Sequence, residues 1–315
     1  MDKHLLDNFY VITVISNPVR FQSRYRLYKE FAERMKTAGV KMLTVECAFG
    51  DRSFQVTDSC NPNHIQVRSF EELWHKENMM NVALSRLPHN WEYVAWIDAD
   101  VQFVDPNWAV QTVHALQHYM VVQMWQSAID IGPDGRHVST HNSFIWQYLQ
   151  GKPYCYGHKG QYYERWHPGY AWAARREAID HLGGFIDTAV LGAGDNHMAH
   201  ALVGRLDESI GKGLHPNYHK HLHIWQDRAE RFVRRDVGIV PGTLIHHWHG
   251  KKKDRRYHDR WKILVENQYN PDQDLKRDFQ GMYQFHDDGT LRSIRLRDQI
   301  RGYFRARNED SIDLE

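Results

Sequence analysis

Two aspartates, Asp98 and Asp100, stand at the end of the apolar run Tyr93–Asp98 (YVAWID), which predicts a buried strand. In an extended chain, residues i and i+2 point the same way, about 7 Å apart along the strand. Two carboxylates placed in this way can share one hard cation, and Mg²⁺ and Mn²⁺ prefer oxygen ligands and bridge to phosphates. The pattern therefore predicts a divalent metal site that receives a phosphorylated ligand. Two solvated turn aspartates are the alternative interpretation.

The segments around these aspartates alternate between strand and helix patterns. Apolar or β-branched runs predict strands over residues 9–16, 41–48, 64–68, 120–126 and 237–247. Amphipathic patterns predict helices over residues 23–38, 69–87, 105–118 and 196–203. Ser69 with Glu72 is expected to cap the second of these helices, and Asp105 the third. Such alternation is typical of βαβ units, so we expect an α/β fold with a mostly parallel sheet flanked by helices.

Three further segments resemble glycosyltransferases of the GT-A type. Lys76–Leu84 (KENMMNVAL) is similar to the helix that contacts the nucleotide sugar in family-2-like members. Gly183–Asp187 (GGFID), followed by Gly192–Asn196 (GAGDN), resembles the GGFDE and GxGxED segments of galactosyltransferase-like members. Together with the aspartate pair, the resemblance covers about residues 9–250. It departs from the family at Asn196 and His197, where many inverting members carry Glu-Asp.

The resemblance implies a third metal ligand near the end of the last predicted strand. GT-A enzymes often supply a histidine from such a position, and neutral imidazole can join two carboxylates on Mn²⁺ or Mg²⁺. In the cluster His246–His249 (HHWH), we expect His249 to join Asp98 and Asp100, because Gly250 lets backbone approach a phosphate closely. A zinc site made of histidines, or a solvated histidine cluster, is the competing interpretation.

The resemblance also implies a general base. An inverting transfer needs a carboxylate that takes the proton of the acceptor hydroxyl, and Asp195 is expected to fill this role, with His197 as a second candidate. Asp195 also precedes a predicted helix, so an N-cap role is equally compatible with the sequence.

Other site residues follow from their position in the family. The expected donor-binding residues, which include the first aspartate of the pair, are Ser16, Asn17, Arg20, Glu46, Asp51, Lys76, Asn78, Asp98, Ala99 and Lys252. The expected acceptor-binding residues, several of which could instead be core aromatics, are Trp166, Tyr170, Gly194, Asn196, Tyr257 and Trp261.

The segment Lys251–Arg256 (KKKDRR) is basic and has three interpretations. It can close over a pyrophosphate and stabilise the departing diphosphate. It can bind the phosphates of a nucleic acid. It can also be a solvated run of charge. The second interpretation agrees with an enzyme like the soluble phage transferases that glycosylate hydroxymethylated bases in DNA. A base within duplex DNA would have to be flipped out of the stack to react.

Composition excludes several classes. With 42% hydrophobic and 25% charged residues among 315, the chain is not disordered, collagenous or a coiled coil. A net charge of +1 names no partner. The three cysteines, Cys47, Cys60 and Cys155, indicate neither a disulfide framework nor a CxxC zinc site. The N-terminus has no apolar signal region and no apolar run has membrane-span length, so we expect a cytoplasmic protein, in the host cytoplasm if viral.

The sequence thus favours a GT-A-like catalytic domain over residues 1–250, with a nucleotide-sugar half (1–126) and an acceptor half (127–250). Residues 127–161 are expected to be loop, and residues 251–315 a basic, then polar, C-terminal extension. The expected activity is metal-dependent, inverting transfer of a sugar from a nucleotide donor, such as a UDP-sugar, to a hydroxyl of a saccharide or a hydroxymethylated DNA base. A nucleotidyltransferase and an inactive GT-A-like module that binds nucleic acid or carbohydrate are the alternatives.

Overall fold

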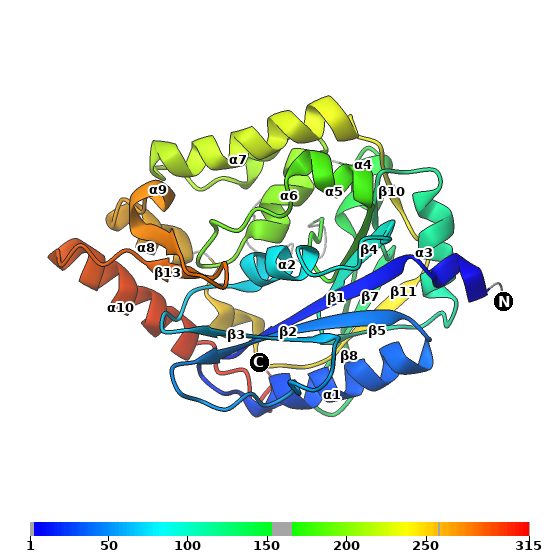
Figure 1. Ribbon diagram of the computed structural model, residues 1–315, viewed down its shortest axis with the longest axis horizontal. Helices are drawn as coiled ribbons and strands as arrows, with labels where there is room; N and C mark the ends of the chain where they lie inside the picture. Colours follow the sequence, from blue (N-terminus) through cyan, green and yellow to red (C-terminus); the bar gives the residue numbers. More distant parts are fainter. Residues whose placement is uncertain (1–2, 153–165, 258, 315) are drawn as a thin grey trace.

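The computed structural model describes residues 3–152, 166–257 and 259–314 (Figure 1). Its strands are β1 (Phe9–Ser16), β2 (Lys41–Phe49), β3 (His64–Ser69), β4 (Tyr93–Ile97), β5 (Val101–Phe103), β6 (Val121–Gln123), β7 (Ser127–Ile131), β8 (His137–Asn142), β9 (Ala171–Arg175), β10 (Val237–Ile239), β11 (Thr243–His246), β12 (Leu275–Arg277) and β13 (Tyr283–Phe285). Its α-helices are α1 (Gln22–Thr37), α2 (Lys76–Leu84), α3 (Trp108–Leu116), α4 (Phe144–Leu149), α5 (Arg176–Leu182), α6 (Gly194–Leu202), α7 (Pro216–Arg228), α8 (Asp259–Glu266), α9 (Pro271–Asp274) and α10 (Leu291–Arg305). Shorter helical turns lie at Lys3–Leu6, Leu206–Ser209, Ala229–Val233 and Lys252–Arg255.

The central sheet has the strand order β10-β6-β9-β4-β1-β2-β3. Every neighbouring pair is parallel except those of β9, which runs antiparallel to β4 and β6. A parallel sheet needs helices over both faces, and Figure 1 shows α1 on one side and α2, α5, α6 and α7 on the other. The predicted α/β fold with a mostly parallel sheet flanked by helices is confirmed. The reversed β9 brings the start of that strand to the end of β4, where the Asp98 amide donates to the Tyr170 carbonyl at 2.8 Å.

A second sheet, β5-β11-β7-β8, stands beyond the end of β4. The chain leaves β4, passes Asp98–Asp100 and enters β5, which pairs antiparallel with β11. β11 also pairs in parallel with β7. In this register His246 lies opposite Val101 of β5 on one side and Asp130 of β7 on the other. The second sheet therefore delivers the histidine cluster to the carboxyl end of β4.

Alternate residues of β1 face two different apolar clusters. Phe9 and Val11 pack with Phe31 of α1 and with residues of α3. Tyr10 and Ile12 belong to a larger cluster that includes residues of α2, α6 and α7 and Phe304 of α10. Strand alternation thus buries both faces of the sheet, and residues 251–315 contribute directly to one of the two cores.

Two predicted helices begin later than expected, because their capping residues make turns instead. The Ser69 hydroxyl accepts from the Glu71 amide at 3.0 Å, and the helix begins at Lys76 rather than at residue 69. The Asp105 carboxylate accepts from the Asn107 amide at 2.8 Å, and that helix begins at Trp108. Both are local side-chain turns that compete with helix capping.

The prediction of a loop over residues 127–161 is wrong for its first part, which holds β7, β8 and α4. β8 has the polar sequence HVSTHN and lies at a sheet edge, so the sequence contains no apolar run that would predict this strand. The single strand predicted over residues 237–247 is two strands, β10 and β11, in different sheets. The remainder of the predicted loop, from residue 153, and Cys155 lie outside the described residues. Cys47 is buried, Cys60 is exposed, and both are free thiols. None of the described helices combines the length and apolar character needed to cross a bilayer.

The packing of α1 on the sheet yields a stability prediction. Phe31 is fully buried, so Phe31→Ala should lower the free energy of unfolding by about 3–5 kcal/mol through lost burial and a residual cavity. Phe279 is 98% exposed, and Phe279→Ala should change stability by about 0.5 kcal/mol or less. Urea denaturation measures both, and equal small losses would contradict the assigned core.

Candidate functional site

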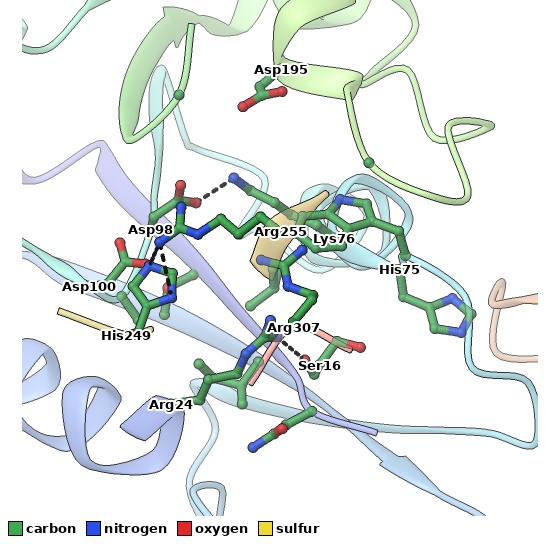
Figure 2. A pocket seen from close by; sticks show the side chains of 18 of the residues that line it. Ser16, Arg24, His75, Lys76, Asp98, Asp100, Asp195, His249, Arg255 and Arg307 are labelled. Carbon is green, nitrogen blue, oxygen red and sulfur yellow. Dashed lines mark hydrogen bonds and ion pairs between the residues drawn. The ribbon is translucent and has the colours of Figure 1, made fainter. Parts of the chain in front are cut away.

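A cavity of about 230 Å³ opens at the carboxyl ends of β1 and β4. Its walls are formed by the end of β1, the turn Asp98–Asp100, the segment after β11 and the end of α10, together with Gly192, Ala193 and Asp195. Figure 2 shows Asp98, Asp100 and His249 grouped on one side, with Asp195 set apart from them and Lys76 reaching toward Asp98. This is where ligands of open α/β sheets bind.

Asp100, His246 and His249 form a cluster with the donor set of a metal site. Their ligand atoms all lie within 4.8 Å of one another. The Asp100 Oδ2 atom is 2.9 Å from His249 Nε2 and 3.9 Å from His246 Nε2, and the two Nε2 atoms are 3.2 Å apart. Burial alone would raise the pKa of Asp100, but the adjacent His249 and His246 hold it well below its usual range. The carboxyl group is therefore a carboxylate.

Two further observations show that these residues fit a divalent cation. Asp100 Oδ1 is buried and has no hydrogen-bond partner among the described residues, so the carboxylate has an unused acceptor. Burial and the neighbouring Arg255 lower the pKa of His249 to about 4, so the imidazole is neutral and able to ligate. Two of the three distances between ligand atoms, 2.9 and 3.2 Å, match bonds of about 2.1 Å to one ion. Arg255 Nη2 lies 2.9 Å from His249 Nε2, so that guanidinium must move aside when a cation binds.

A buried carboxylate orients His246 from behind. His246 Nδ1 lies 2.8 Å from Asp130 Oδ1, which leaves Nε2 facing Asp100. Asp130 also accepts from Ser139 at 2.5 Å, from Tyr170 at 3.2 Å and from Lys252 at 2.6 Å. Such carboxylate–histidine contacts fix the ring of a metal ligand.

The sequence did not single out His246, because strand alternation was extended through His249. β11 ends at His246, and the following residues turn, which brings His246 and His249 to the same carboxylate. The two histidines are three residues apart, a spacing that brings side chains together in a turn, and this spacing could have suggested that they act together.

Asp98 is part of the same wall but outside this three-residue cluster. Its carboxylate forms an ion pair with Lys76 Nζ, at the first residue of α2. Burial opposes charge on both groups; Asp98 nevertheless raises the pKa of Lys76 above its usual value, so the ammonium remains charged. The expected shared ligation by both aspartates stays a prediction.

Asp195 lies in the first turn of α6, whose N-cap is Ala193. One carboxylate oxygen, Oδ1, accepts from the Asn196 amide at 2.7 Å. The other lies against Gly169, where a side chain would meet it at 3.2 Å. Asp195 is therefore not the N-cap, but it accepts a hydrogen bond from a backbone amide in the first turn of the helix. It also lines the cavity. A carboxylate in the first turn is favoured by the helix dipole.

His197, the second base candidate, does not line the cavity. It is fully buried, and its ring nitrogens lie 2.8 Å from the Ser209 hydroxyl and 3.0 Å from the Tyr218 hydroxyl. Burial holds the pKa of His197 well below its usual value.

A buried ion-pair network forms the floor of the cavity. Glu309, near the C-terminus, accepts from Arg24 Nε at 2.5 Å and from Arg307 Nε at 2.6 Å. Arg24 also donates to the Ser16 carbonyl at 2.5 Å, at the end of β1. Burial would raise the pKa of Glu309, but the two guanidiniums hold it well below its usual range. The sequence missed these residues because two of them lie in the polar C-terminal extension, far from any motif.

The expected donor-binding residues divide between the cavity wall and structural contacts. Those that line the cavity are Ser16, Asn17, Lys76, Asp98 and Ala99. Those outside the lining are Arg20, Glu46, Asp51, Asn78 and Lys252. Glu46 accepts from the amides of residues 55–57, and Asn78 bonds the Gly281 carbonyl and the Tyr283 amide. These side chains hold loops rather than face the cavity.

The expected acceptor-binding residues divide in the same way. Tyr170 and Tyr257 line the cavity, whereas Trp166, Gly194, Asn196 and Trp261 do not. Trp166 is buried with its ring edge-on to Phe144, and Trp261 packs beside Gly211 and His197.

No protein-family model matches the chain, and no curated protein matches it. Among solved structures, it is similar to the catalytic domain of Drosophila β1,4-galactosyltransferase 7 in complex with xylobiose, at 14% identity and a TM-score of 0.32, over 64% of this chain and 61% of that one. It is similar to residues 1–349 of S. aureus TarS at 12% identity and a TM-score of 0.43, over 95% and 71%. It is also similar to 4-diphosphocytidyl-2C-methyl-D-erythritol synthase from Anaerococcus prevotii at 12% and 0.32, over 76% and 89%.

One of these solved proteins, the galactosyltransferase, belongs by name to the class of enzymes that the sequence resembles. A variant of the same galactosyltransferase is described in complex with manganese, UDP-Gal and xylobiose. The chain spans 61% of the galactosyltransferase structure that it matches. At these identities and TM-scores, the function has to be inferred from the chain's own residues.

The cluster predicts the outcome of a metal titration. His246→Ala and His249→Ala should each weaken Mn²⁺ binding about tenfold or more, because each removes one of three ligands. His247 is the matched control: its ring contacts Gln102 at 3.3 Å, so His247→Ala should bind Mn²⁺ like the parent. Electron paramagnetic resonance measures free Mn²⁺, and parent-like binding in either ligand variant would contradict the assignment.

Glu77, the second residue of α2, is a buried carboxyl group that the sequence did not single out. It lies against Gly194, where a side chain would meet its carboxyl carbon at 2.6 Å. Burial raises the pKa of Glu77 to about 8, with Lys76 opposing and Asp195 adding to the rise. The group is therefore mostly protonated at neutral pH.

This raised pKa predicts a pH-dependent stability. As pH rises from the ordinary pKa of 4.5 to about 8, the unfolded chain releases the Glu77 proton while the folded chain keeps it, so the free energy of unfolding falls. Glu77→Gln stays neutral throughout and should lack this part of the fall, which amounts to a few kcal/mol at most. Urea denaturation of parent and variant at about pH 5 and pH 9 tests this, and an identical pH slope in the two proteins would refute it.

Proposed function

We propose that the protein is a metal-dependent glycosyltransferase that uses a nucleotide-sugar donor. The observation that carries the proposal is the meeting of a possible three-ligand metal cluster, cationic side chains and an acidic side chain on the walls of one cavity. Asp100, His246 and His249 would hold Mn²⁺ or Mg²⁺. The cation would neutralise the charge that develops on the departing nucleoside diphosphate.

Cationic side chains near this cluster supply the rest of the diphosphate site. Arg255 forms no ion pair among the described residues, and it faces His249 and the cavity. When it moves from His249, its guanidinium can donate two parallel hydrogen bonds to a phosphate. Lys76, fixed by Asp98, adds a second positive charge beside the same group. Both residues stabilise the leaving group electrostatically.

Asp195 is the proposed general base. It lines the cavity apart from the metal cluster (Figure 2), so an acceptor bound beside it would approach the sugar from the side away from the diphosphate. The Asp195 carboxylate would take the proton of the acceptor hydroxyl as its oxygen attacks the anomeric carbon. Attack opposite the leaving group inverts the configuration at that carbon.

The sequence leaves two candidates for the acceptor, a saccharide and a hydroxymethylated DNA base. The basic segment 251–256 gives the DNA candidate little support. Lys251 pairs with Asp313, Lys252 with Asp130 and Arg256 with Asp259, at 3.7, 2.6 and 2.5 Å. These lysines and arginine are engaged within the chain, and Arg255 faces the cavity. A saccharide acceptor is therefore favoured.

Product analysis distinguishes this function from its alternatives. Incubated with UDP-sugars and Mn²⁺, the protein should release UDP slowly even without an acceptor, and the release should stop with a chelator. A nucleotidyltransferase would instead form pyrophosphate from a nucleoside triphosphate. A binding module with an inactive core would show no turnover with either substrate.

The proposed base predicts a split between binding and turnover. Asp195→Asn should lower turnover about 100-fold or more, because the amide cannot take the proton, while UDP-sugar affinity stays within about twofold. Asp207→Asn is the control, since Asp207 lies outside the cavity lining and pairs with His223. Steady-state kinetics and calorimetry give both numbers. Turnover retained in Asp195→Asn would remove Asp195 from the mechanism.

A further inference from the structure

Arg260, in the first turn of α8, is a cation of the cavity wall that has no anionic partner among the described residues. Its guanidinium forms no hydrogen bond or ion pair with any residue that the structure describes, and its Nε atom is buried. Arg24 and Arg307, by contrast, share Glu309. A buried polar atom without a partner is costly, which indicates that a ligand completes its hydrogen bonds.

Aromatic rings hold the Arg260 guanidinium without using its donors. Its central carbon lies 5.3 Å from the ring centre of Tyr257 and 5.0 Å from that of Trp261. Cation–π contacts of this kind position the group and leave its N–H edges free.

A second unsatisfied donor belongs to Trp74, another residue of the cavity wall. The indole Nε1 of Trp74 is buried and has no partner among the described residues. Gly192 lies against both groups: a side chain there would sit 3.5 Å from Arg260 Nη1 and 3.6 Å from the Trp74 ring. Gly192 also has a φ of 86°, which favours glycine. The backbone of Gly192, three residues before Asp195, thus lies against both Arg260 and the Trp74 ring, and all three residues line the cavity.

We propose that Arg260 and Trp74 bind an anionic group of the acceptor, a phosphate or a carboxylate, while Asp195 receives the proton of its hydroxyl. This inference rests on the proposed function. In the proposed function, the donor diphosphate is bound by the metal cluster, Arg255 and Lys76. Arg260 lies elsewhere on the wall, beside Gly192, and Gly192 belongs to the segment that carries Asp195. A guanidinium can bind phosphate or carboxylate through two parallel hydrogen bonds, and Trp74 adds a third. The acceptor class is thus a phosphorylated or carboxylated sugar.

Calorimetry with a charged and a neutral probe tests the inference. With UDP and Mn²⁺ saturating the donor side, glucose 6-phosphate should bind the parent at least tenfold more tightly than glucose. Arg260→Gln should abolish that preference, and Trp74→Phe, which keeps the ring but not the N–H, should reduce it several-fold. Arg256→Gln is the matched control, because Arg256 pairs with Asp259 outside the cavity lining, and it should behave like the parent. An unchanged preference in Arg260→Gln, or no preference in the parent, overturns the inference.

A second arm decides whether the anion belongs to the donor instead. The ratio of UDP-glucuronate to UDP-glucose affinity, measured with Mn²⁺, should be the same in the parent and in Arg260→Gln. A selective loss of UDP-glucuronate binding in the variant would place the anion on the donor and overturn the acceptor assignment. Metal-dependent UDP binding by the parent distinguishes failure of the proposed function from failure of this inference. If the parent does not bind UDP in a metal-dependent way, the proposed function is refuted. If it does but shows no preference for the phosphorylated sugar, only this inference is refuted.

Discussion

The carboxylate of Asp100, held between the imidazoles of His246 and His249, is the contact on which the rest of the site depends. It joins the central sheet, which ends in Asp98–Asp100, to β11 of the second sheet. The register of β11 places His246 opposite both Val101 and Asp130, so the strand pairing itself aligns the histidine with the carboxylate that supports it. A slip of one residue would turn His246 to the other face and break its contact with Asp130. The second sheet therefore positions the cluster of Asp100, His246 and His249.

The C-terminal extension completes the cavity from the other side. Glu309 fixes Arg24 of α1 and Arg307 after α10, and Asp310 accepts from the amides of Gln22 and Ser23, both at 2.8 Å. The chain end thus closes the first turn of α1 and braces the cavity floor at the same time. Arg255 and Arg260 also come from beyond residue 250. The domain boundary expected at residue 250 therefore falls within the cavity wall, because residues before and after it both line the cavity.

The strands and helices with strong apolar periodicity, and the strand-end aspartates, follow from local sequence. β1, β2, β3 and β4 lie within a residue or so of their predicted bounds, because each is buried and reads as an apolar run. β8 could not be predicted, since its stability comes from pairing with β7 rather than from its own polar residues. The role of His246 and of Glu309 depends on long-range pairing that no local pattern contains. Arg260 and Trp74, far apart in sequence, both lie against Gly192, which is distant from each of them along the chain.

The central claim is that the Asp100 cluster holds the metal through which a nucleotide diphosphate binds. Calorimetric titration of UDP into the parent and into Asp100→Asn, with Mn²⁺ and then with a chelator, tests it most directly. The account predicts that Mn²⁺ tightens UDP binding to the parent at least tenfold, and that Asp100→Asn loses this gain while keeping the parent's melting temperature within a few degrees. UDP affinity that is the same with Mn²⁺ and with the chelator, or a gain that survives in Asp100→Asn, would contradict it.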